Sequence, residues 1–151
     1  MTLLVILSQA LLYFCFSLLI GSFIVQAIPD DYKPTISIKR KWLVISTIAI
    51  PILTFMPILQ VVLILQPQFG FFKSLANVLV SYKIGLAWDI TLLLSVVLLI
   101  YVKIFNNSRS VWFYVFGVVK VILLIASVAW ASHASSMEPI LGFIFDFTHL
   151  L

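Results

Sequence analysis

Four long, uninterrupted apolar segments dominate this sequence. They run over residues 3–28, 42–65, 84–105 and 111–131. Each is long enough to cross the hydrocarbon core of a bilayer as a helix, which takes about 20 residues. The runs are continuous, whereas the strands of a transmembrane barrel alternate polar and apolar residues. The sequence therefore predicts an all-α fold, a polytopic transmembrane helical bundle with four full spans in one membrane domain, residues 1–151.

A fifth apolar run covers residues 139–151 and is too short to span a bilayer. We predict a partial helix there and expect the chain to be the front part of a longer protein. Between the second and third spans, residues 71–82 place their large apolar side chains on one helical face, which predicts an interfacial helix on the outer leaflet. Pro67 is expected to end the second span, because proline lacks the amide that continues a helix.

Composition excludes several classes of protein. Hydrophobic residues make up 64% of the chain and charged residues only 9%, whereas a soluble domain is nearer half apolar and a quarter charged. The net charge of +4 does not indicate nucleic-acid binding, because the cations stand in short loops between apolar runs. One cysteine permits neither an intrachain disulfide nor a CxxC metal site. The sequence contains no nucleophile–base pair, phosphate loop or zinc-ligand spacing, so we do not predict an enzyme.

The distribution of cations predicts the orientation of the spans. The first and third loops carry most of them: Lys33, Lys39, Arg40 and Lys41 in the first, and Lys103 and Arg109 in the third. The second loop holds only Lys73 and Lys83, and residues 132–138 hold none. Because cytoplasmic loops are enriched in lysine and arginine, we predict a multi-pass cell-membrane protein with its N-terminus outside.

Polar residues at membrane depth are the candidate functional residues, because they are costly in lipid. Asp146 and His149 are three residues apart and share a helix face. At about 1.5 Å per residue, His149 lies roughly 15 Å in from Pro139. His133 is expected near the outer surface, offset from His149 by around 10 Å in depth. This spacing favours a vertical relay of a metal ion over one shared site.

His133 and Met137 are four residues apart and can form a small nitrogen–sulfur pair at the outer mouth. Imidazole and thioether ligands suit copper, and thioether favours Cu(I). We therefore take His133, Met137, Asp146 and His149 as candidate copper ligands.

Each polar residue also has a structural interpretation. His133 can be a simple interfacial residue, and His149 can be a buried neutral histidine bonded to Asp146. Lys120 can snorkel or pair with Asp146 or Asp89. Two sulfur-bearing residues, Met56 and Cys15, are explained by packing, although both are speculative further copper stations.

Several of these residues resemble a known family. Trp130-Ala-Ser-His133-Ala134, then Gly142, then Asp146-Phe-Thr-His149-Leu150-Leu151 resembles the signature of the copper resistance protein D family, the CopD/PcoD/YcnJ-like membrane domain. Leu18-Leu19-Ile20-Gly21-Ser22 followed by Pro29 is similar to the family's opening helix, and Gly85-Leu86-Ala87-Trp88 is similar to its Gly-x-x-Trp. Thr91 stands where the family often has an arginine.

The resemblance implies the front half of an eight-helix domain that handles copper. It implies copper uptake or copper resistance across the bacterial cytoplasmic membrane, with an outward-facing CopC-like copper-binding protein as a partner. Two alternatives remain open. One is a haem-binding membrane protein, although two histidines at different depths make bis-histidine ligation strained. The other is a non-catalytic structural subunit in which Asp146, His149 and Lys120 only hold helices together.

Overall fold

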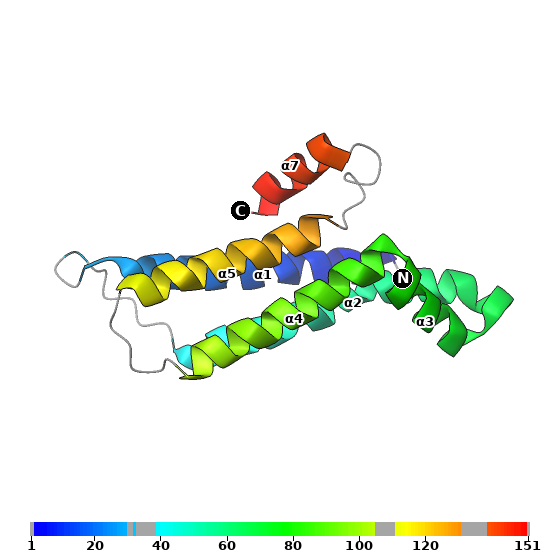
Figure 1. Ribbon diagram of the computed structural model, residues 1–151, viewed down its shortest axis with the longest axis horizontal. Coiled ribbons are helices and arrows are strands. Elements are labelled where there is room, and N and C mark those ends of the chain that lie inside the picture. Colours follow the sequence, from blue (N-terminus) through cyan, green and yellow to red (C-terminus); the bar gives the residue numbers. More distant parts are fainter. Residues whose placement is uncertain (1, 30–31, 33–38, 105–110, 131–138, 151) are drawn as a thin grey trace.

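The computed structural model describes residues 2–29, 32, 39–104, 111–130 and 139–150. Its regular elements are α1 (Thr2–Ala27), α2 (Arg40–Phe69), α3 (Phe71–Ser81), α4 (Lys83–Ile104), α5 (Val111–Trp130) and α7 (Pro139–Leu150) (Figure 1). Among these, α1, α2, α4 and α5 are long and apolar enough to cross a membrane, and the described residues contain no strand. The predicted all-α membrane bundle is confirmed.

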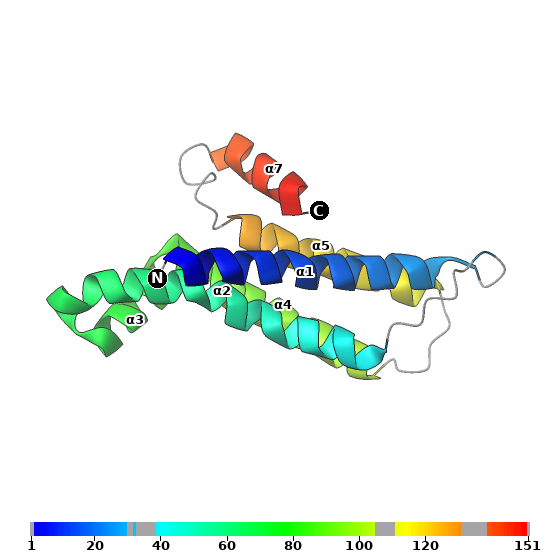
Figure 2. The same ribbon diagram turned by 180° about the vertical axis from the view of Figure 1, so that it is seen from behind.

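The four long helices lie side by side as a bundle. Helix α1 packs against α2 and α5, and α4 packs against the same two helices (Figures 1 and 2). Helix α3 folds back against α2 and α4 at one end of the bundle. Helix α7 lies beside α5 and leans toward the bundle at its C-terminal end.

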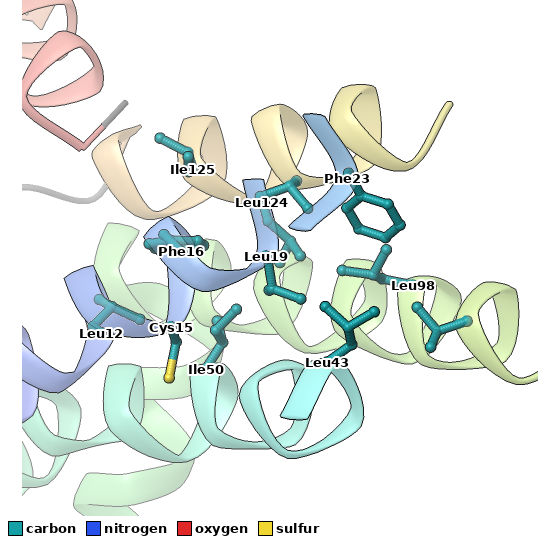
Figure 3. Packing of buried hydrophobic residues seen from close by; sticks show 12 residues of the cluster. Leu12, Cys15, Phe16, Leu19, Phe23, Leu43, Ile50, Leu98, Leu124 and Ile125 are labelled. Atoms are coloured by element: carbon teal, nitrogen blue, oxygen red, sulfur yellow. The ribbon is translucent and has the colours of Figure 1, made fainter. Parts of the chain in front are cut away.

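Side chains from all four long helices meet in one apolar core. Figure 3 shows Phe16 and Leu19 of α1 facing Leu98 of α4 and Leu124 of α5, and each of the four is fully buried. Large apolar side chains also cover the outer surface of the same helices. Lipid is as apolar as these residues, so close packing rather than withdrawal from water holds such helices together.

Helix α2 runs past the point where the sequence predicted its end. Pro67 lies inside the helix, which continues to Phe69. A proline lacks only its own amide donor, so the amides that follow it can still donate to carbonyls four residues back along the helix. Gly70 then ends the helix with a φ of 78°, and its amide donates to the carbonyl of Gln66 at 2.9 Å. The positive φ suits glycine, because it has no Cβ.

Helix α3 is amphipathic, but protein covers much of the face that the sequence assigned to lipid. Phe71, Leu75 and Leu79 pack around buried Val78, against residues of α2 and α4. Only part of the apolar surface, such as Phe72 with 83% of its area exposed, is left uncovered. The helix therefore closes one end of the α2–α4 pair instead of resting only on lipid.

At the opposite end of the bundle, Arg40 ties the start of α2 to the end of α4. Its guanidinium donates to the carbonyls of Val102 at 2.7 Å and Lys103 at 2.6 Å. The last carbonyls of a helix have no donor within the helix and carry partial negative charge. Arg40 satisfies two of them and fixes the relative height of the two helices.

Candidate functional site

Helix α7 brings His149 against the middle of α1. The imidazole ring meets the ring of Tyr13 with centroids 5.6 Å apart and planes inclined at 86°. Tyr13 lies near the midpoint of α1 (Thr2–Ala27). The C-terminal end of α7, which carries His149, is the end that leans toward the bundle (Figures 1 and 2). His149 is therefore at the depth of the middle of a membrane-spanning helix.

Asp146 lies one turn before His149 on the same helix. It is half-buried, whereas His149 is exposed on the flank of the bundle. In the described part of the chain, no hydrogen bond or ion pair joins Asp146 to His149 or to any other side chain. The structural interpretation of a histidine bonded to a neighbouring aspartate is not realised here.

The two other candidate ligands, His133 and Met137, lie outside the described residues. Within the ranges that are described, no three histidine, cysteine or acidic residues come together as a group that could hold a metal ion. The only candidate ligands whose positions the structure gives are therefore the two on α7.

Lys120 is held by aromatic rings and not by a carboxylate. Its ammonium nitrogen lies 4.0 Å from the centroid of the Tyr101 ring and 5.7 Å from that of Phe116. No ion pair to Asp89 or Asp146 exists among the described residues, so of the two interpretations left open for Lys120 the pairing with a carboxylate is not seen in this part of the chain. A cation over an aromatic face is stabilised by the ring quadrupole, and more so away from water.

A groove of about 570 Å³ runs between α2 and α4. Met56, Phe55 and Trp88 are among its lining residues, and nearly all of the lining is apolar. Cys15 does not line this groove, because it is buried in the apolar core of the bundle (Figure 3). The two speculative sulfur stations are therefore on different sides of α2.

The Gly-x-x-Trp pattern has a structural explanation at the corner where α3 meets α4. A Cβ on Gly85 would lie 2.6 Å from Cα of Leu79 and still closer to the carbonyl oxygen of Val78. Only glycine allows the two backbones to approach this closely. One turn later, the indole nitrogen of Trp88 donates to the carbonyl of Pro51 at 2.8 Å. The pattern thus joins α4 to both α3 and α2.

Thr91 links α4 to α5. Its hydroxyl lies 2.8 Å from the hydroxyl of Ser127 and 2.8 Å from the carbonyl of Ala87, and both side chains are buried. A hydrogen bond between membrane helices contributes about 1 kcal/mol. At this position, where the resembled family often has an arginine, the present chain has a helix-packing contact.

Replacing Trp88 with phenylalanine is expected to lower the free energy of unfolding by about 1 kcal/mol. The variant keeps an aromatic ring beside Phe55 but leaves the Pro51 carbonyl without its indole donor. Thermal unfolding in detergent measures the change. Trp112→Phe is the matched control, because Trp112 is 70% exposed. Equal stability of the two variants would contradict the role of this hydrogen bond.

Comparison with known proteins identifies the family. The family described as "Copper resistance protein D-like, N-terminal domain" matches residues 1–143. The match includes the positions of His133 and Met137 and ends before Asp146 and His149. No curated protein and no solved structure was found to match the chain. With nearly its whole length matched and four membrane-spanning helices, the chain belongs to the copper resistance protein D-like family as its N-terminal domain, a multi-pass membrane domain with a function related to copper.

Proposed function

We propose that this domain passes copper through the membrane from the outer face, in copper uptake or copper resistance. The observation that carries the proposal is the position of His149, a histidine at mid-depth of the bundle that is exposed on its flank. Among the described residues, His149 makes a ring contact with Tyr13 and no hydrogen bond or ion pair with a side chain. The family's link to copper supplies the identity of the ion.

The free-energy cost of polar side chains at membrane depth favours a functional role for Asp146 and His149 over a structural one. A polar side chain at membrane depth is costly unless it is paired, faces a water-filled path or binds a ligand. Neither Asp146 nor His149 is paired among the described residues, so neither holds two helices together by a hydrogen bond. A neutral imidazole and a carboxylate are both competent copper ligands.

The order of the ligands along the chain suggests a relay. His133 and Met137 would receive copper at the outer mouth, where nitrogen and thioether ligands favour this metal. Asp146 and then His149, one turn further along α7, would hold it at successive depths about 4.5 Å apart. With the N-terminus outside, as the loop charges predict, an outward-facing CopC-like protein would deliver copper to the outer mouth at His133 and Met137.

The test is copper binding by the purified chain in detergent, with wild type beside the His133→Ala/His149→Ala double variant and each single variant. We expect wild type to retain copper, each single variant to bind it more weakly and the double variant to lose it. Metal analysis and the absorption spectrum measure this, and copper accumulation by cells that express each protein extends it to transport. Unchanged copper content and accumulation in the double variant would contradict the relay. A Soret band in place of copper would indicate the haem alternative.

A further inference from the structure

We propose that Tyr13 is a positioning residue for copper bound at His149: its ring holds the imidazole plane so that a ring nitrogen is presented to the metal. This inference rests on the proposed function and adds a residue of α1 to a site otherwise built on α7. It assigns Tyr13 no bond to the metal. What Tyr13 contributes is the orientation of the ligand.

The rings of Tyr13 and His149 meet edge to face. Planes inclined at 86° with centroids 5.6 Å apart are one of the arrangements that aromatic pairs prefer, with the edge of one ring against the face of the other. A histidine that binds a metal usually has its ring orientation fixed by a hydrogen bond from its second nitrogen. Within the described ranges His149 has no such hydrogen bond, so the contact with Tyr13 is what restricts its ring.

Tyr13 stands at an unusual depth for a tyrosine of a membrane protein. Tyrosines of membrane proteins gather at the two interfaces, where the hydroxyl meets water. Tyr13 instead lies near the middle of α1, and no hydrogen bond from its hydroxyl is found among the described residues. A phenol at this depth costs more than a phenylalanine would. Two polar residues, Gln9 and Ser17, stand one turn before and after it and are likewise exposed.

Helix α7 is anchored on either side of the contact between His149 and Tyr13. Phe147 and Leu150 pack against the apolar core of the bundle. Because these neighbours fix the rotation of α7 about its axis, His149 reaches α1 at Tyr13 in a defined register. The contact between His149 and Tyr13 therefore belongs to the surface by which the C-terminal turn of α7 packs against the bundle.

The experiment compares Tyr13→Leu, Tyr13→Phe and Phe14→Leu with wild type and His149→Ala, all as the full chain in detergent loaded with Cu(II). Electron paramagnetic resonance and a competition titration measure the coordination and affinity of the copper. The spectral component that disappears in His149→Ala is the one assigned to this site. Phe14 is the matched control, because it is the next residue and 62% exposed.

We expect Tyr13→Leu to bind copper at this site about tenfold more weakly and with a broadened spectrum, in the range seen when a support of a metal ligand is lost. Tyr13→Phe keeps the ring and should resemble wild type, as should Phe14→Leu. If Tyr13→Leu does not fold, Tyr13→Ile also removes the aromatic ring and, unlike methionine, adds no sulfur ligand for copper.

Three results separate the possible failures. Wild-type affinity and spectrum in the variants without the ring would overturn the role of Tyr13 while leaving the proposed function intact. Equal loss in Tyr13→Phe and Tyr13→Leu would also overturn it, because the hydroxyl and not the ring would then be responsible. Unchanged copper binding in His149→Ala would instead overturn the proposed function on which this inference rests.

Discussion

Replacing Gly85 with alanine is expected to lower the free energy of unfolding by about 3 kcal/mol, at the upper end of what overpacking costs. The added Cβ would meet the backbone of Val78 and Leu79, and no side chain can rotate away to make room. The α3–α4 corner must open for the variant to fold. Since α3 also packs on α2, the loss should extend to the C-terminal part of that helix as well.

The native cysteine allows the stability of the Gly85→Ala variant to be measured directly. Cys15 is the only cysteine of the chain and is buried in the core, so a thiol-reactive dye reports the opening of the bundle as temperature rises. Gly21→Ala is the matched control, because a Cβ there meets no atom within 4 Å. Alanine also favours the helix by up to about 1 kcal/mol over glycine. A Gly85→Ala transition as high as that of Gly21→Ala would contradict the close approach of α3 and α4.

Gly117→Ala is expected to lower the free energy of unfolding by about 2 kcal/mol. Here too an added Cβ has no room, but the atoms that it would meet belong to a side chain and not to the backbone. The added Cβ would lie 2.6 Å from two carbons of the Phe23 ring, which is buried and packs edge-on against Phe113. Overpacking of a filled core costs about 1–3 kcal/mol. The same thermal assay measures the change in stability.

A second substitution distinguishes this clash from other effects. Phe23→Leu removes the ring, so its combination with Gly117→Ala should be less destabilised than the sum of the two single variants, by about 1–2 kcal/mol of coupling. Strict additivity of the two substitutions would contradict the clash. Gly85→Ala, whose neighbours are backbone atoms, should show no comparable rescue by Phe23→Leu.

The spanning helices were predictable because length and apolar character alone decide whether a helix can cross a bilayer. The end of α2 was not, because the rule that proline stops a helix concerns its missing amide, and α2 continues for two residues after Pro67. The surroundings of α3 were not predictable either. An apolar face on a helix shows that something covers it but does not show whether lipid or protein does.

For the candidate site, the sequence predicted which residues are costly in lipid but not which groups stand beside them. Asp146 and His149 were found from their spacing on one helix face. For Lys120 the sequence left open snorkelling or a carboxylate partner, and it did not predict that the ammonium group lies over the ring of Tyr101 from a different helix. Tyr13 was missed, because one aromatic residue in an apolar helix resembles ordinary packing. Its position at mid-span was the available signal.

The length of α2 has a consequence for the surrounding bilayer. Its 30 residues extend for about 45 Å, whereas the 20 residues of α5 extend for about 30 Å, close to the thickness of a hydrocarbon core. The longer helix must tilt or project, and Figure 1 shows its last turns reaching with α3 beyond the start of α1. Without the polar residues at its two ends, the apolar run over residues 42–65 still extends for about 36 Å, so the protein presents different hydrophobic heights around its circumference. Lipids beside α2 and beside α5 must stretch or thin to different degrees, so bilayer thickness acts on the two sides of the bundle unequally.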